Sequence, residues 1–246
     1  MHKLIINSLY KNFENFTINI KDFFSSNKNT IHKARNEIKI INYDNTDTVV
    51  KSFKEPNIIN KIAYTFFRDS KARKSYYNSL RVDDFVPTPL SYIEFYENTL
   101  LKDSYFISKK FDYDFTIREP LLDADFKNKD AIFKAFAIFT LQLHNNGIYH
   151  EDYSPGNILI KKEKKAFLFK IVDVNRMSFL TLSEKDRAKN FSKLWASDKI
   201  LKIMATEYMQ NFDCSDDFIK NVLYYSNKNK KIKNFKKRLK GKPVND

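Results

Sequence analysis

Three residues have the types and spacing that phosphoryl transfer requires: Asp152, Asn157 and Asp173. This reaction needs a carboxylate beside the attacking hydroxyl and oxygen ligands for magnesium close by. Asp152 suits the first task, and Asn157 and Asp173 suit the second. Asp152 and Asn157 share one loop, and Asp173 ends the second strand of the hairpin that follows. The spacing therefore predicts that the three side chains converge on one cleft.

The elements around this loop can be predicted from residue patterns. Apolar residues at Ile132, Phe136, Phe139 and Leu143 recur with helical spacing, and Gly147 is placed to end that helix. After the loop, the apolar segments 158–160 and 167–172 flank a lysine-rich turn, which is typical of a hairpin. The catalytic candidates thus follow a helix and bracket a hairpin.

The first hundred residues predict a small sheet that carries a helix. Alternating β-branched residues indicate two strands joined by a turn at residues 44–47. A helical segment is expected to break near Ser70 and to end before Pro87. Residues 1–30 are interpreted as an N-terminal extension that is partly helical. The predicted strands cover residues 37–42, 48–53, 90–96 and 104–108, and the chain from 182 onward is predicted to be helical.

Composition excludes several kinds of site. The 246-residue chain has only three glycines, Gly147, Gly156 and Gly241, so neither a dinucleotide-binding Gly-x-Gly-x-x-Gly turn nor a Walker A loop is present. A single cysteine, Cys214, cannot form an internal disulfide, which favours a reducing cytoplasm. The most apolar stretch, 131–143, is too short to span a bilayer, so we expect a soluble protein.

The loop and its surroundings resemble the protein-kinase-like superfamily. Thr48-Val49-Val50-Lys51 is similar to the strand that carries the phosphate-binding lysine, with Lys54 as the alternative lysine nearby. His150-Glu151-Asp152 stands where regulated protein kinases have His-Arg-Asp, and Asp173-Val174-Asn175 stands for Asp-Phe-Gly. No Ala-Pro-Glu and no long loop follow, which favours a small-molecule, sugar or lipid-linked acceptor over a peptide.

Within that superfamily the chain resembles the lipopolysaccharide core kinases, that is, the Kdo/heptose kinases and their InaA-like relatives. The resemblance covers about residues 31–200. It rests on four stretches: Lys33-Ala34-Arg35-Asn36-Glu37, Arg68 to Tyr76 leading to Thr88-Pro89, His150 to Leu159, and Asp173-x-x-Arg176 followed by Lys189-Asn190-Phe191.

This resemblance implies an α+β, two-lobed protein-kinase-like fold, with a small N-terminal antiparallel sheet lobe and a larger, mainly helical C-terminal lobe. It also implies ATP-dependent phosphorylation of a core sugar hydroxyl, on Kdo or heptose or another anionic sugar acceptor. The reaction would take place at the cytoplasmic face of the inner membrane of a Gram-negative organism. The expected domains are an extension (1–30), a nucleotide-binding N-lobe (31–110), a C-lobe with the catalytic loop and metal site (111–227) and a basic tail (228–246).

The resemblance also implies roles for the site residues. Asp152 would be the catalytic base, Asn157 and Asp173 would hold Mg2+, and Lys51, with Arg35 and Asn36, would bind ATP. The supporting residues are His150, which would tie the loop to the backbone near Asp173; Gly156, which would supply a positive-φ turn; and Arg176, for a phosphate, an acceptor acid group or a salt bridge.

Two features leave alternatives open. The helix after Ser70 has no glutamate to pair with Lys51, so either an acid such as Glu37 replaces it or Lys51 is held differently. A catalytically inactive pseudokinase or a basic binding module is therefore an alternative. Tyr153 fits either the acceptor site or the core. The remaining rival is a kinase of a soluble small molecule, similar to aminoglycoside or choline kinases, but the net charge of +14 favours an anionic acceptor.

The end of the chain is strongly basic. Residues 228–242 contain nine Lys/Arg and no acid, and Ile232, Phe235 and Leu239 have helical spacing. This pattern predicts a basic amphipathic helix on an anionic membrane surface. A frayed, solvated terminus and a non-selective nucleic-acid contact are the alternatives, and no specific nucleic acid is expected.

Overall fold

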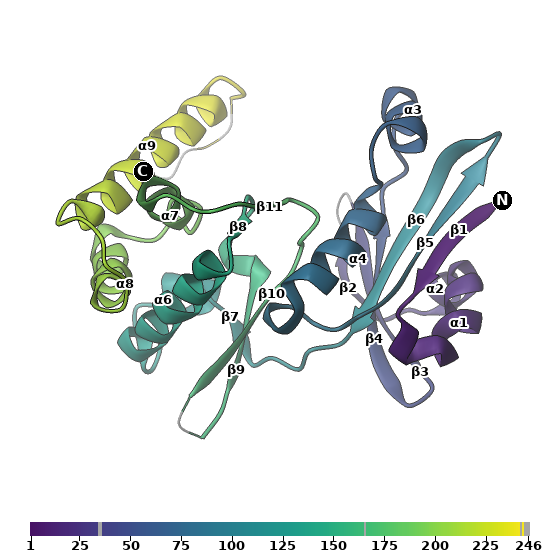
Figure 1. The fold of residues 1–246 in the computed structure, drawn as a ribbon, viewed down its shortest axis with the longest axis horizontal. Helices are drawn as coiled ribbons and strands as arrows, with labels where there is room; N and C mark the ends of the chain where they lie inside the picture. Colours follow the sequence, from purple (N-terminus) through teal and green to yellow (C-terminus); the bar gives the residue numbers. More distant parts are fainter. Residues whose placement is uncertain (34–35, 165, 242, 244–246) are drawn as a thin grey trace. The chain divides into compact units, whose positions relative to one another are not determined.

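The computed structural model describes residues 1–33, 36–164, 166–241 and 243. Its contacts divide the chain into two compact units (Figure 1). Unit 1 comprises Met1–Asp112 together with the short segment Asp173–Asn175, and unit 2 comprises Tyr113–Val172 and Arg176–Asp246. The short segment lies between two parts of unit 2 in the sequence, but its contacts are with unit 1.

Unit 1 is built on a six-stranded antiparallel sheet with the order β1-β5-β6-β4-β3-β2. The four strands predicted from the sequence are confirmed as β3 to β6. Asp44 and Asn45 both have positive φ, 50° and 56°, which makes the tight β3–β4 turn compatible with the twist of the strands. The strands are β1 (His2–Ile6), β2 (Thr30–Lys33), β3 (Glu37–Tyr43), β4 (Thr46–Phe53), β5 (Pro89–Glu97) and β6 (Leu100–Lys109).

The first thirty residues are an integral part of unit 1, although the sequence indicated an extension. β1 pairs with β5 from His2↔Phe95 to Ile6↔Ser91. The 3-10 helix Ser8–Phe13 and helices α1 (Glu14–Ile18) and α2 (Ile20–Ser26) then cover one face of the sheet (Figure 1). The apolar side chains that they bury against the sheet are Phe13, Phe16, Ile20 and Phe24.

Helix α4 covers the opposite face. The expected break at Ser70 is confirmed: α3 (Ile58–Phe66) ends before it, and the Ser70 side chain accepts from Arg73 N to cap α4 (Lys71–Val82). Ala72 and Tyr76 of α4 pack against Phe53 of β4 in a second core cluster. Side chains alternate along a strand, so Lys51, two residues before Phe53, points to this same face.

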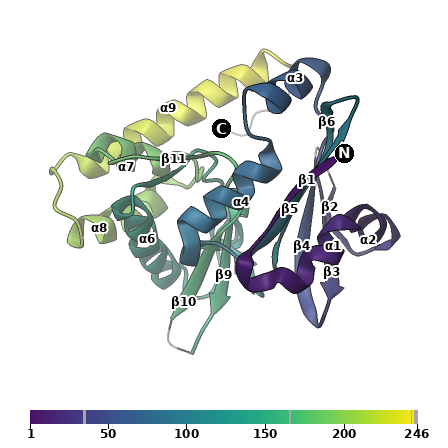
Figure 2. The ribbon, with the colours of Figure 1, turned by 45° about the vertical axis from the view of Figure 1, so that its right-hand side comes forward.

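Unit 2 is mainly helical, and short strands flank the loop that carries Asp152 and Asn157. β9 pairs with β10 and β7, and β8 pairs with β11. Figure 2 shows α6 to α9 of this unit. The elements are β7 (Phe115–Thr116), α5 (Arg118–Leu122), α6 (Lys129–Asn145), β8 (Ile148–His150), 3-10 helix Pro155–Asn157, β9 (Ile158–Lys162), β10 (Phe167–Ile171), β11 (Met177–Phe179), α7 (Glu184–Phe191), α8 (Asp198–Gln210) and α9 (Phe218–Arg238).

Gly147 ends α6 as predicted. Its φ is +69°, and its N–H donates to the His144 carbonyl at 3.0 Å. A Cβ at this position would lie 2.9 Å from the Leu180 carbonyl oxygen. Both the left-handed backbone and the close approach of the strand β11 region therefore require glycine.

The basic terminal segment is ordered as the second half of α9. Asn229 donates to the Ser192 carbonyl and Lys230 to the Ala196 carbonyl, both at 2.7 Å. These bonds fix the start of the basic segment on unit 2, and the helix continues to Arg238, which contrasts with a frayed terminus; Lys242 and residues 244–246 lie outside the described part. Where the structure describes the chain, its helices are all too short or too polar to cross a lipid bilayer.

Candidate active site

His150 organises the start of the candidate loop. Its Nδ1 accepts the backbone N–H of Asp152 at 3.1 Å, so Nε2 carries the ring proton and donates to the Val172 carbonyl at 3.0 Å. The ring is buried. Asn190 of α7 donates to the His150 carbonyl at 3.0 Å. The buried histidine thus ties the loop to the residue that directly precedes Asp173 in the chain.

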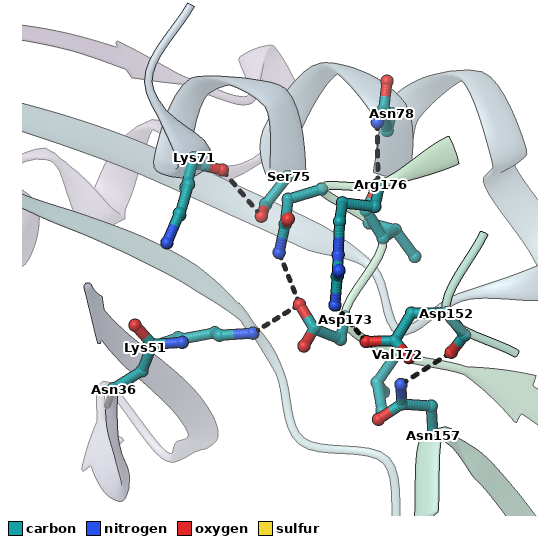
Figure 3. Close-up of polar contacts among 12 residues, drawn as sticks. Asn36, Lys51, Lys71, Ser75, Asn78, Asp152, Asn157, Val172, Asp173 and Arg176 are labelled. Carbon is teal, nitrogen blue, oxygen red and sulfur yellow. Dashed lines mark hydrogen bonds and ion pairs between the residues drawn. The ribbon is translucent and has the colours of Figure 1, made fainter. Parts of the chain in front are cut away.

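The Asp152 carboxylate is held from one side. Arg176 Nη2 forms an ion pair with Asp152 Oδ2, and both side chains are accessible (Figure 3). Asn157 Nδ2 donates to the Asp152 backbone carbonyl at 2.9 Å, which fixes the amide and turns its oxygen away from that carbonyl. Of the roles considered for Arg176, the structure shows the salt bridge within unit 2.

Asp173 belongs to unit 1 and is bound by Lys51. Lys51 Nζ lies 2.7 Å from Asp173 Oδ1, and Asn175 Nδ2 also donates to this oxygen (Figure 3). Asn78 of α4 donates to the Val174 carbonyl at 2.7 Å. Asp173 has a φ of 59°, a left-handed conformation that aspartate tolerates. Together these bonds hold residues 173–175 on unit 1.

The partner of Lys51 settles a question left open by the sequence. No glutamate from α4 is needed, because Asp173 supplies the carboxylate and Asn78 provides the link to the helix. Glu37 instead lies 3.7 Å from Lys39 Nζ. Lys51 is therefore held differently from the expected lysine–glutamate arrangement, and its ammonium is already beside a candidate metal ligand.

The other residues predicted to bind the nucleotide, or named as an alternative to Lys51, are Asn36, Arg35 and Lys54. Lys54 follows the end of β4, and its backbone N–H donates to Asn36 Oδ1 at 3.3 Å. In the described part of the chain, Asn36 forms no hydrogen bond with Lys51. Arg35 lies outside the described residues. Lys51 is thus the candidate that the structure brings to Asp173.

Tyr153 belongs to the core. Its side chain is fully buried, and its hydroxyl is 2.9 Å from Thr140 Oγ1 of α6. Burial raises the pKa of Tyr153 well above its ordinary value. Of the two roles considered for Tyr153, the structure therefore supports packing and not contact with an acceptor.

The prediction that Gly156 supplies a positive-φ turn is wrong. Gly156 lies in the 3-10 turn Pro155–Asn157 and does not have positive φ. A Cβ there would lie 2.7 Å from Arg118 Nη2, so a larger residue would have to displace the end of this flexible side chain. Arg118, at the start of α5, was missed by sequence reasoning because its partner lies 38 residues away in a loop. It brings a positive charge to the segment between Asp152 and Asn157.

A buried polar network supports the loop from behind. His144 Nδ1 is 2.9 Å from Tyr208 Oη, and His144 Nε2 is 3.1 Å from Asn190 Oδ1. Arg187 Nη1 donates to Tyr208 Oη at 2.8 Å, which leaves the hydroxyl proton of Tyr208 for Nδ1 and the ring proton for Asn190. Because Asn190 also binds the His150 carbonyl, the network links α6, α7 and α8 to the candidate loop.

Acid is expected to weaken unit 2 through His144. Burial lowers the pKa of His144 from 6.5 to about 4; the hydrogen bond with Asn190 opposes this shift, and the nearby Arg187 charge adds a smaller lowering. The unfolded chain therefore binds the proton first, and stability is full above pH 6.5 and falls as the pH drops toward 4. The loss is about 3 kcal/mol, because one pKa unit corresponds to about 1.4 kcal/mol. Urea unfolding at pH 7.5 and pH 4.5 measures it.

The matched variant for this prediction is His144→Asn. This variant lacks the titrating group, so its free energy of unfolding should change less between the two pH values, even if it is lower throughout. An equal pH dependence in both proteins would contradict the assignment to His144.

The donor set is compatible with magnesium. Asn157 offers an amide oxygen and Asp173 a carboxylate, and Mg2+ is commonly held in proteins by one or two such oxygens together with substrate phosphates. Asn157 Nδ2 is already used for the Asp152 carbonyl, which leaves its amide oxygen for a cation. The structure places the candidates in two sets: Lys51 with Asp173, and His150, Asp152, Asn157 and Arg176.

Comparisons with known proteins show what the sequence and the fold resemble. The sequence model of the Lipopolysaccharide kinase (Kdo/WaaP) family matches residues 117–213. The chain is similar to the solved structure of WaaP in complex with acyl carrier protein, with a TM-score of 0.61, 13% identity and coverage of 94% of this chain and 99% of that chain. It is also similar to the Rio2 kinase complex with ADP, Mg2+ and phosphoaspartate from Chaetomium thermophilum, with a TM-score of 0.48, 14% identity and coverage of 88% and 67%. No curated protein matches.

The likeness to WaaP extends over nearly all of both chains and shows a shared fold. The kinase-like α+β fold predicted from the sequence, with an antiparallel sheet and a mainly helical part, is therefore confirmed. The family match includes Asp152, Asn157, Asp173 and Arg176. The resemblance to the lipopolysaccharide core kinases is thus confirmed as well: residues 117–213 carry the sequence pattern of the lipopolysaccharide kinase (Kdo/WaaP) family, on a chain with the fold of WaaP.

Proposed function

We propose that this protein transfers the γ-phosphoryl group of ATP to a sugar hydroxyl of the lipopolysaccharide inner core, on Kdo or heptose. The observation that carries the proposal is the family match over residues 117–213, which includes the hydrogen-bonded loop from His150 to Asn157. Residues 31–110 would bind the nucleotide and residues 111–227 would supply the base and a metal ligand. The reaction would take place at the cytoplasmic face of the inner membrane.

Asp152 is the proposed base. Its carboxylate would accept the proton of the acceptor hydroxyl, and the Arg176 guanidinium on Oδ2 would leave Oδ1 for that proton. The backbone of Asp152 is fixed from both sides, since its N–H binds His150 and its carbonyl binds Asn157. The loop therefore holds the base in place before any substrate binds.

Asn157 and Asp173 would hold Mg2+, and Lys51 would bind the nucleotide phosphates. When bound, the metal would neutralise charge that develops on the transferred phosphoryl group. Lys51 already lies 2.7 Å from the Asp173 carboxylate, so one ammonium could contact both the metal ligand and a phosphate oxygen. Arg35 and Asn36 complete the proposed nucleotide contacts.

Two measurements test the proposal. Transfer of radiolabelled phosphate from ATP to delipidated core oligosaccharide should require both the protein and Mg2+. A thermal shift with Mg-ATP should exceed the shift with ATP and EDTA. No shift with Mg-ATP would favour a pseudokinase, and transfer to aminoglycosides or choline but not to the core would favour a kinase of soluble small molecules.

We further propose that the basic segment 228–242 binds an anionic membrane surface. The apolar side chains Ile232, Phe235 and Leu239 are 45%, 60% and 71% exposed, whereas Asn234, which faces unit 2, is only 9% exposed. The same segment carries nine Lys/Arg. Exposed apolar side chains among many cations are typical of helices that lie in the interface of anionic lipids.

Point variants test the membrane contact better than removal of the tail, which would also remove the bonds of Asn229 and Lys230. The double variant Phe235→Ser, Leu239→Ser should bind vesicles of mixed anionic and neutral lipid about tenfold more weakly, because two apolar groups no longer enter the lipid. Sedimentation with vesicles at low salt measures this loss.

Tyr224→Ser is the matched control, since Tyr224 is 56% exposed on the same helix but precedes the basic segment. It should bind like the unmodified protein. High salt should weaken the binding of all three proteins, because the attraction to anionic lipid is screened. Equal vesicle binding by the double variant would contradict the proposal.

A further inference from the structure

A cavity of about 510 Å3 opens in unit 2. Glu151, the residue before Asp152, and Arg176, its ion-pair partner, both line it. Residues 180–183 join β11 to α7, and Leu180 and Leu182 of this connection form part of the cavity wall. The cavity is thus lined by the residue that precedes Asp152 and by the arginine that pairs with it.

The cavity carries two lysines that have no protein partner in the described part of the chain. Lys189 and Lys193, at the end of α7 and just beyond it, line the cavity, and neither ammonium forms a hydrogen bond or an ion pair with a described residue. The acids of the cavity are already engaged. Glu151 accepts from Ser178 Oγ at 2.8 Å, and Asp186 accepts from the Ser183 N–H and hydroxyl to cap α7. Neither acid forms an ion pair with Lys189 or Lys193, so both ammonium groups remain available to an anionic ligand.

Neighbouring groups add to this positive field. Burial lowers the pKa of Lys233 on α9, with Lys193 as the next cause, while Asp152 acts in the opposite direction. Lys233 is consequently close enough to interact with both Lys193 and Asp152. Such a concentration of cations around one carboxylate attracts an anion to the position next to the base.

The other wall of the cavity suits a sugar. Burial raises the pKa of Tyr149, with the nearby Asp186 carboxylate as the next cause, so its hydroxyl remains protonated and can donate. The Glu151 carboxylate can accept from sugar hydroxyls, and Leu180 and Leu182 give an apolar surface for a ring face. A cavity that combines cations with hydroxyl-binding groups fits a charged sugar better than an inorganic ion.

We propose that this cavity is the acceptor subsite, and that Lys189 and Lys193 bind the carboxylate or phosphate of an anionic sugar so that a neighbouring hydroxyl lies at Asp152. The inference rests on the proposed function and adds the residues that select the acceptor. Charge-assisted bonds from the two ammonium groups would hold the acid group, and Glu151 would hold ring hydroxyls. The acceptor would be chosen by its charge and not by a peptide sequence.

The test uses the full chain and delipidated core oligosaccharide as the acceptor. The variants are Lys189→Met and Lys193→Met, singly and together, because Met keeps the length of the side chain without its charge. Each single change should raise the KM for the oligosaccharide about tenfold, and the KM for ATP should stay within about twofold. Lys185→Met, exposed on α7 but outside the cavity, should leave both values unchanged.

The chemistry of the acid group is tested with modified acceptors. Oligosaccharide with reduced carboxyl groups, and oligosaccharide treated with a phosphatase, should each be compared with the untreated acceptor. The modification that removes the recognised group should raise the KM of the unmodified protein for the oligosaccharide. The double lysine variant should have the same KM for that modified acceptor as for the untreated one. The result identifies carboxylate or phosphate as the recognised anion.

Direct binding separates this inference from the proposed kinase activity. Calorimetry should show binding of the oligosaccharide to the unmodified protein and its loss in the double variant. If binding behaves in this way but no phosphate is transferred, the subsite is supported and the kinase proposal is contradicted. Phosphate transfer with an unchanged oligosaccharide KM in the double variant, or a rise in the ATP KM alone, would overturn the subsite, as would the absence of oligosaccharide binding to the unmodified protein.

Discussion

Replacement of Asp152 by Asn is expected to lower kcat for phosphate transfer to core oligosaccharide by about 10²- to 10⁴-fold. Asn has the same shape but cannot accept the proton of the acceptor hydroxyl, and general-base catalysis contributes in this range. The backbone bonds of residue 152 with His150 and Asn157 do not involve its side chain and should persist. Steady-state kinetics with ATP and the oligosaccharide measure the change.

The same variant provides its own control. Mg-ATP should raise the melting temperature of Asp152→Asn as much as that of the unmodified protein, because neither Lys51 nor Asp173 is altered. Arg176→Gln removes the ion pair but keeps the carboxylate, so its kcat should fall much less. A kcat for Asp152→Asn within about twofold of the original would contradict the role of Asp152 as the base.

Local sequence patterns were sufficient for much of this fold. Asp44-Asn45 sets a tight turn because both residues tolerate positive φ, and Ser70 and Gly147 mark helix boundaries by the bonds that they make or allow. In each case the decisive contacts lie within a few residues along the chain. Such elements can be predicted without knowledge of the tertiary structure.

Long-range pairings were not accessible in this way. The strand His2–Ile6 was missed because its short apolar run has no hairpin partner nearby, and it pairs with β5 about ninety residues later. Likewise, the helix after Ser70 has no glutamate that could pair with Lys51. The carboxylate that binds Lys51 comes from Asp173, 122 residues away. The spacing in sequence carries no signal for such contacts.

Within the candidate site, the sequence indicated which residues belong to the loop, but not always the structural reason for a residue type. The loop from His150 to Asn157 has its expected order, and His150 binds the carbonyl before Asp173. Gly156, however, lacks the positive φ that was expected, and it lies against the Arg118 guanidinium. Lys189 has a place in the sequence analysis only within the stretch Lys189-Asn190-Phe191, and Lys193 has none, because the cavity that both residues line forms only in the tertiary structure.

Replacement of Asp173 by Ala is expected to abolish the Mg2+-dependent part of ATP binding and to lower kcat by about 10³-fold or more, since the metal stabilises the transition-state charge. The thermal shift with Mg-ATP should fall to the value obtained with ATP and EDTA. Lys51→Met should weaken ATP binding as well, but the remaining binding should still respond to Mg2+. This difference separates a metal ligand from a phosphate ligand.

The change should also lower stability without any ligand. The Lys51 side chain is 11% exposed, and removal of its partner at 2.7 Å leaves a largely buried ammonium without that ion pair. Loss of one partner of such a pair costs about 1 to 3 kcal/mol, which urea unfolding can detect. Asp173→Asn keeps an oxygen for Lys51 and should recover part of this stability but little activity.

Glu97→Gln is the matched control. Glu97 pairs with Lys102 at 2.9 Å on the exposed β5–β6 hairpin of the same unit, with side chains 61% and 38% exposed. Because solvent screens an exposed pair, its loss should leave stability nearly unchanged and the Mg-ATP shift intact. If Asp173→Ala kept the Mg2+-dependent shift while losing stability, Asp173 would serve only to hold Lys51, and the metal would have to be bound by other residues.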